Sequence, residues 1–199
     1  MMTVRTKGLE MNVQITRREK GFEFVTKNWP ITQGCIKALN SDCINDHISV
    51  IVLSQCRMFL GLGNNLGSWP GYWPLGGRRK KKDTDGYETD KEVAVRLMKD
   101  RLGIDVADPN RFSNFCTFYF VWSQESEGSS LRVKSTIMLV EITVFEEARI
   151  KEQGLKNRYK EFGFFPLEAL PKAKTFEIHP ALKFCASKII NDALHTKIR

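Results

Sequence analysis

The residues best suited to chemistry gather in one stretch, residues 73–104. It opens with the glycine pair Gly76-Gly77, and five cations follow at once in residues 78–82. Glycines let a backbone approach a ligand closely, and a cluster of cations attracts anions. Glu88, Arg96 and Asp100 then fall on or beside a helix. Together these residues indicate a phosphate-binding site.

A helix must position the second half of this stretch. Thr89 or Asp90 can cap its start, and Gly103 is suited to end it just after Leu102. Its apolar residues recur at helical spacing and predict one buried face: Val93, Ala94, Leu97, Met98 and Leu102.

The other elements are mostly strands. Alternating and β-branched runs predict strands at 11–27 around a turn at Gly21, at 47–54 with a hairpin partner at 56–62, at 111–122, at 131–145 and from 162. Residues 31–40 can form a short helix or a loose connection, and 146–156 can form a short helix. Residues 180–197 are typical of an amphipathic C-terminal helix. This mixture predicts one α+β domain over residues 1–199, with 1–45 as an extension packed on it.

Composition limits the class of protein. The net charge is +8, which favours polyanions such as nucleotides, nucleic acid or anionic lipid, or simply serves solubility. The sequence shows no long apolar run and no secretory signal, so we expect a cytoplasmic protein that does not span a membrane. Five cysteines without C-x-x-C spacing indicate reduced residues, mostly in the core. Three scattered histidines do not have the spacing of a metal site. A homodimer is kept as an option.

Residues 73–104 resemble a Nudix box, G-x5-E-x7-R-E-U-x-E-E-x-G-U, where U is apolar. Glu88 and Arg96 match its E-x7-R, and Gly103-Ile104 match its end. Residues 161–167 resemble the strand that commonly follows the box. The resemblance implies an α/β/α sandwich with a central mixed sheet, the box helix after the glycine loop, and a C-terminal helix.

The resemblance also implies a metal site, and here the sequence departs from the pattern. The three carboxylates of R-E-U-x-E-E lie at i, i+3 and i+4, which share one helix face and converge on Mg²⁺ or Mn²⁺. In this chain the three positions hold Leu97, Asp100 and Arg101. Ten residues separate Gly77 from Glu88, where the pattern has five, so a basic insert lies beside the loop.

Two Nudix subfamilies are similar in part. GDP-mannose mannosyl hydrolases resemble the chain at Gly71-Tyr72-Trp73, at Arg78 and at Arg96-Leu97. The RNA-binding small subunit of the pre-mRNA cleavage factor, a Nudix fold without hydrolysis, resembles it over residues 96–103.

We therefore expect a divergent Nudix hydrolase of a nucleoside diphosphate derivative such as a nucleotide sugar, with weakened magnesium chemistry. The resemblance implies Gly77, Asp100 and Glu88 as metal ligands, and Glu161 and Asp100 as catalytic residues. The substrate would be bound by Arg78, Arg79, Arg96, Tyr72 and Trp73.

The alternative is an inactive Nudix fold that binds nucleotide or RNA through its basic loop. Simpler roles also remain open: Asp100 as an ion-pair partner of Arg96, and Tyr72 and Trp73 as packing residues.

Overall fold

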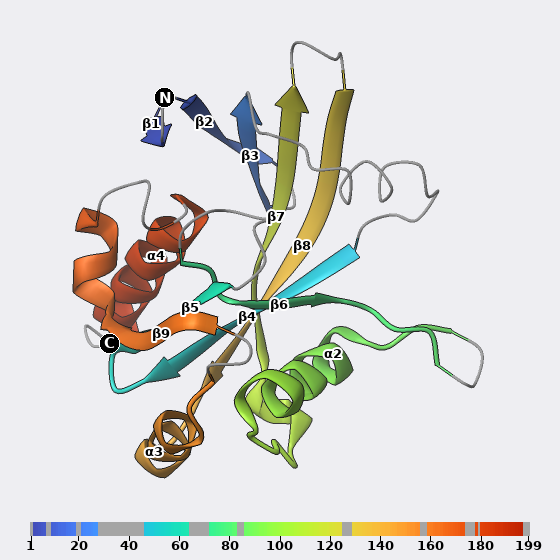
Figure 1. The fold of residues 1–199 in the computed structure, drawn as a ribbon, viewed down its shortest axis with the longest axis vertical. Coiled ribbons are helices and arrows are strands. Elements are labelled where there is room, and N and C mark those ends of the chain that lie inside the picture. Colours follow the sequence, from blue (N-terminus) through green and yellow to red (C-terminus); the bar gives the residue numbers. More distant parts are fainter. Residues whose placement is uncertain are drawn as a thin grey trace.

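The computed structural model describes residues 2–6, 9–18, 21–27, 46–63, 72–82, 86–124, 129–155, 159–173, 178 and 180–196. The described strands form one mixed sheet in the order β1-β2-β3-β7-β8-β4-β5-β9, and β6 pairs with β4 (Figure 1). The strands are β1 (Met2–Thr6), β2 (Leu9–Arg18), β3 (Gly21–Lys27), β4 (Asp46–Ser54), β5 (Arg57–Gly63), β6 (Leu75–Arg78), β7 (Ser113–Gln124), β8 (Ser129–Glu141) and β9 (Tyr159–Pro166).

Helices cover both faces of the sheet. The helices are α2 (Asp90–Leu97), α3 (Val144–Gln153) and α4 (Pro180–Thr196), with a π-helical turn (Met98–Leu102) after α2 and 3-10 turns at Pro109–Arg111 and Leu167–Lys172. One hydrophobic cluster joins the sheet to α4, and the other joins it to α2 and α3. The architecture is therefore the predicted α/β/α sandwich.

Most elements lie where the sequence predicts them, with three differences. The strand expected to end at residue 145 ends at Glu141, because Thr143 caps α3 in a reciprocal pair of hydrogen bonds with Glu146. Residues 21–27 do not merely pack on the domain: β3 pairs in parallel with β7 and continues the sheet. No sequence pattern predicted β1. Residues 31–40, expected as a short helix or a loose connection, lie outside the described residues.

Strand β4 has one partner along one edge and two partners along the other, and this arrangement positions the glycine pair. One side of β4 pairs in parallel with β8, while the other side pairs with β6 over residues 47–50 and with β5 at residues 53–54. Gly76 and Gly77 therefore lie in β6, opposite Ser49 and Ile48. Beside them, α2 packs on the same sheet face as Val50 and Leu75.

A buried carboxylate joins α3 to the β4–β5 hairpin. Glu147 is 3% exposed. Its Oε2 accepts hydrogen bonds from Ser54 Oγ at 2.5 Å and from Arg57 Nη2 at 2.8 Å. Its Oε1 lies 2.6 Å from Lys151 Nζ, an ion pair whose alignment is poor for a hydrogen bond. This network holds α3 against the sheet.

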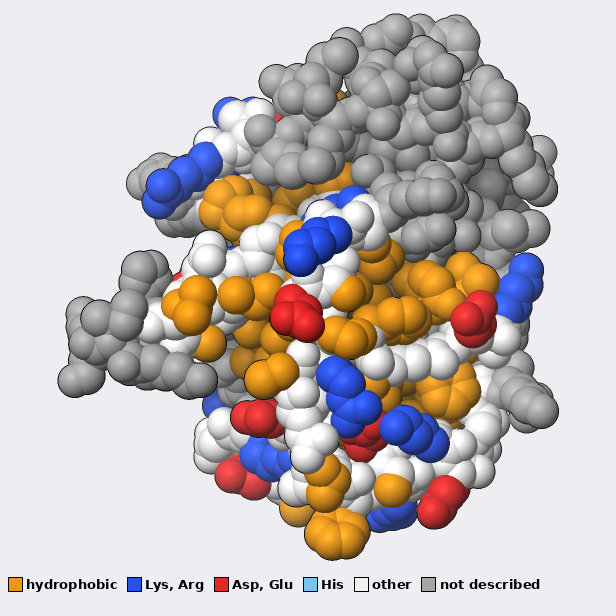
Figure 2. Space-filling view, turned by 90° about the vertical axis from the view of Figure 1, so that its left-hand side faces the viewer, with side chains coloured by type: hydrophobic (Ala, Val, Ile, Leu, Met, Phe, Trp, Pro, Cys, Tyr) orange, Lys and Arg blue, Asp and Glu red, His pale blue; other side chains and the backbone are white. Residues whose placement is uncertain are grey.

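The side of the molecule that carries α4 and β9 shows charges of both signs among hydrophobic side chains (Figure 2). Among the described side chains that this view shows, neither sign of charge dominates. None of the described helices is long and apolar enough to cross a membrane.

Candidate phosphate-binding groove

A groove of about 500 Å³ lies between the end of β6 and the helical segment that follows it. Its lining combines five cations with a single carboxylate, a leucine and a glycine: Arg78, Arg79, Lys80, Arg96, Arg101, Asp100, Leu97 and Gly77. The glycine pair, the basic insert and the helix, which the sequence placed in one functional stretch, thus meet in space.

Glu88 and Arg96 hold the frame of the groove. Arg96 Nε and Nη2 donate to the two carboxylate oxygens of Glu88, each at 2.6 Å. Arg96 Nη2 also donates to the carbonyl of Arg78 at 2.9 Å, and the amide of Lys80 donates to Glu88 Oε2 at 2.7 Å. Arg96 thus holds the helix against the loop, and its expected contact with a substrate stays a prediction. Glu88, expected as a metal ligand, has both oxygens engaged by protein donors.

Arg79 is a second brace. Its Nε donates to Asp46 Oδ2 at 3.1 Å, its Nη1 donates to the carbonyl of Glu88 at 2.6 Å, and its Nη2 donates to Asp90. The sequence gives no signal for Asp46 and Asp90 as partners of Arg79. Asp46 is 33 residues from Arg79 in the chain, and no local pattern connects them.

The Glu88–Arg96 pair makes a pH-dependent contribution to stability. The hydrogen bond from Arg96 lowers the pKa of Glu88, against an opposing effect of burial. A carboxyl whose folded-state pKa is lowered stabilises the fold above its unfolded pKa and loses that contribution as the pH falls through the folded value.

We expect Glu88→Gln to lower the free energy of unfolding by about 1–2 kcal/mol at neutral pH, because the paired charge is lost. Urea denaturation at several pH values checks this. The difference in the free energy of unfolding between wild type and Glu88→Gln should shrink at pH values below the unfolded-state pKa of Glu88. A deficit independent of pH would contradict the ion-pair origin. Glu152→Gln, an exposed change on α3, is the control.

Leu97 fills the space where the Nudix pattern has a carboxylate. It is 2% exposed and belongs to the hydrophobic cluster under α2. A Cβ on Gly77 would lie 2.9 Å from Leu97 Cδ2, so the two residues pack directly on each other. The side chain at this position therefore serves packing.

Asp100 and Arg101 belong to the π-helical turn and are both exposed along the groove. Leu97, Asp100 and Arg101 do share one face, as their spacing predicts. Only Asp100 offers oxygen ligands there. Among the described residues, no group of three or more His, Cys, Asp or Glu side chains could hold a metal ion.

The structure does not bring Tyr72 and Trp73 into the groove. Trp73 exchanges two backbone hydrogen bonds of 3.0 Å with Gly61, and its ring lies 5.8 Å from that of Phe120. Tyr72 makes an edge contact with Phe165 at 5.0 Å. Both residues pack in the hydrophobic cluster under α4, on the sheet face opposite α2. Packing is thus the role that the structure shows for them.

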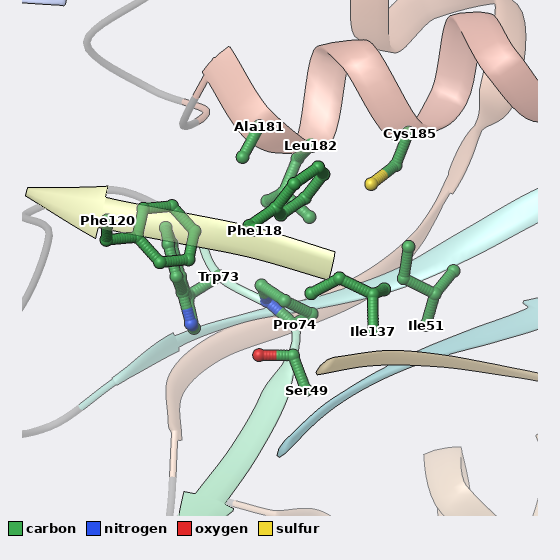
Figure 3. A pocket seen from close by; sticks show the side chains of 10 residues that line it. All are labelled: Ser49, Ile51, Trp73, Pro74, Phe118, Phe120, Ile137, Ala181, Leu182 and Cys185. Carbon is green, nitrogen blue, oxygen red and sulfur yellow. The ribbon is translucent and has the colours of Figure 1, made fainter. Parts of the chain in front are cut away.

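Trp73 also lines a small cavity with Pro74, Phe118 and Phe120, beneath Leu182 and Cys185 of α4 (Figure 3). The volume that the centre of a water molecule can occupy in this cavity is only about 10 Å³. That is room for about one water molecule, so the cavity as it stands cannot admit a nucleobase.

Glu161 also lies away from the groove. It is exposed on β9, opposite Leu62 of β5. Its neighbour Phe162 packs with the cluster under α2. Because side chains alternate along a strand, Glu161 points to the other face. Its proposed catalytic role stays a prediction.

Solved structures share this fold. The Escherichia coli dihydroneopterin triphosphate pyrophosphohydrolase is 12% identical with a TM-score of 0.52, over 74% of this chain and 96% of that one. Shewanella oneidensis NrtR is 12% identical with a TM-score of 0.51, over 74% of this chain and 64% of that one. The Nudix domain of NrtR, solved with ADP ribose, is 12% identical with a TM-score of 0.48, over 80% of this chain and 99% of that one.

No protein-family model matches the sequence, and no curated protein matches it. At these identities the likeness to solved structures concerns the fold. The chain shares the fold of the two structures with TM-scores above 0.5, and this is the Nudix fold that the resemblance of residues 73–104 implies.

Proposed function

We propose that the groove binds the diphosphate of a nucleoside diphosphate derivative, and that this contact needs no metal ion. The observation that carries the proposal is the lining of the groove, five cations against one carboxylate. Two of the cations, Arg79 and Arg96, are held by acidic partners. Arg78, Lys80 and Arg101 form no ion pair with any described acidic residue, so they are available to a ligand.

These three side chains suit a diphosphate. A guanidinium presents several N–H donors in a plane and binds phosphate oxygens through two of them at once. Lysine adds a compact positive charge. The groove is also large enough for a diphosphate and part of the group attached to it.

The residues present do not form a dedicated magnesium site. Of the metal ligands that the resemblance implies, only Asp100 and the carbonyl of Gly77 line the groove. Cations surround both of them. Mg²⁺ requires octahedral oxygen coordination and usually binds through one or two carboxylates together with substrate phosphates. Arg101, at a position where the Nudix pattern has a glutamate, would repel it.

Weak hydrolysis of a nucleotide sugar is the second candidate function, because Asp100 survives at a position of the Nudix pattern and lines the groove. Under this candidate, Mg²⁺ or Mn²⁺ arrives with the substrate, and phosphate or sugar release is slow.

Calorimetric titration with nucleoside diphosphates and with GDP-mannose, in EDTA and then in excess Mg²⁺ or Mn²⁺, tests the proposal. We expect saturable binding in EDTA and a change in Kd smaller than about tenfold on adding metal. Binding that appears only with metal would contradict metal-independent recognition. Metal-stimulated sugar or phosphate release that is lost in Asp100→Ala would favour the second candidate.

A further inference from the structure

The basic insert is an ordered part of a two-stranded ribbon. Lys81 pairs with Tyr87, the amide of Lys82 donates to the carbonyl of Gly86 at 3.1 Å, and the amide of Glu88 donates to the carbonyl of Lys80 at 3.0 Å. Residues 83–85, between Lys82 and Gly86 in the sequence, lie outside the described residues. The ribbon continues from β6 past α2 and projects away from the sheet (Figure 1).

The cations of this ribbon fall into two groups. Arg79 is held by Asp46 and Asp90, and Lys82 Nζ donates to Glu92 at 2.8 Å. These two brace the ribbon against the sheet and α2. Arg78, Lys80 and Lys81 are exposed or lie on the groove, and none forms an ion pair with a described acidic residue. Acidic partners thus fix the ribbon in place and leave a row of cations that have no ion-pair partner in the part of the chain that the structure describes.

An exposed aromatic side chain lies beside this row. Tyr87 is 62% exposed and is the strand partner of Lys81. Neither residue lines the groove. A diphosphate bound by Arg101, Arg78 and Lys80 therefore leaves both unused, and a ligand that contacts all of them must extend along the ribbon.

We propose that the groove and the ribbon together bind a single-stranded polynucleotide. Its phosphates follow Arg101, Arg78, Lys80 and Lys81, and one base stacks on Tyr87. The inference rests on the proposed function, since the groove takes one phosphate group of the strand. Successive cations that follow a backbone, with an aromatic ring offered to an unpaired base, are the features by which proteins bind single strands. In a duplex the bases are already stacked on each other, so Tyr87 would gain no such contact.

The test uses fluorescently labelled oligo-U, oligo-dT and a DNA duplex, with binding followed by anisotropy across a range of salt concentrations. Lys81→Glu and Tyr87→Ala change the ribbon outside the groove. Lys160→Glu, an exposed change on β9, alters the net charge as much as Lys81→Glu does. ADP binding is measured in parallel for every variant, and circular dichroism checks the fold.

We expect Lys81→Glu and Tyr87→Ala each to weaken single-strand binding by about tenfold and to leave ADP binding unchanged. Lys81→Glu should also reduce the slope of log affinity against log salt concentration by about the value of one phosphate contact. Lys160→Glu should change neither this slope nor the affinity by much. Comparison of oligo-U with oligo-dT shows whether RNA or DNA is preferred.

Two results would overturn the inference: unchanged single-strand binding in both ribbon variants, or an equal loss in Lys160→Glu. Tighter binding of the duplex than of either single strand would also overturn it. Failure of ADP to bind wild-type protein that still binds oligonucleotides would instead refute the proposed function, so the two failures are distinguishable.

Discussion

Arg101→Glu is expected to weaken metal-independent binding of a nucleoside diphosphate by at least about tenfold. The change removes a guanidinium from the groove and places a carboxylate beside Asp100. A hydrogen bond to a charged group contributes about 1.5–3 kcal/mol, and the new negative charge adds repulsion of the phosphates. Calorimetry in EDTA measures the change. Because Arg101 is exposed, the variant should fold normally.

The same variant also probes the metal. With two adjacent carboxylates, Mg²⁺ should partly restore nucleotide binding to Arg101→Glu, while the wild-type protein gains little. Arg149→Glu, an exposed change on α3, reproduces the change in net charge away from the groove and should leave binding intact. Wild-type affinity in Arg101→Glu would show that the groove is not the phosphate site.

Glu147→Ala is expected to produce the largest loss of stability, about 1–3 kcal/mol in the free energy of unfolding, because hydrogen-bonding groups lose their partner. Arg57 loses its acceptor and Lys151 loses its ion-pair partner, and both cations are partly exposed to solvent. Ser54 loses its acceptor as well. Urea denaturation at neutral pH measures the loss. Glu152→Ala, exposed on the same helix, should stay within about 0.5 kcal/mol of wild type.

Acid should reproduce part of this loss. Burial raises the pKa of Glu147, but the ion pair with Lys151 and the hydrogen bond from Ser54 outweigh it and the net shift is downward. The stabilisation is therefore present above the unfolded pKa and is lost as the pH falls through the folded one. The difference between wild type and Glu147→Ala should narrow in acid. A constant difference would show that the lost contacts are mainly those of packing.

Local patterns predicted the box helix and most strands because their causes are local. Thr89 and Glu92 form the capping box that starts α2, and Gly103, with φ of 66°, ends the turn that follows. These residues lie within the element that they define. A continuous run of apolar, β-branched residues likewise identified β4, whose interior is buried on both faces.

The parts that could not be predicted depend on contacts between distant segments. Nothing local to residues 21–27 indicates that β3 pairs in parallel with β7. The separation of Trp73 from the groove follows from its pairing with Gly61, which turns its side chain toward the face under α4. A linear motif places such residues near one another in sequence but does not specify which face of the sheet each one occupies.

The contact between Leu97 and Gly77 bears on how this groove can change. A glutamate at residue 97 would place a charge at a position that is 2% exposed, against a glycine backbone. Burying an unpaired charge costs several kcal/mol, more than many domains can lose. To convert this chain into a metal-dependent enzyme, the interface between α2 and the sheet would therefore have to be repacked first. In evolutionary terms, the burial of residue 97 against Gly77 opposes the return of a glutamate at this position.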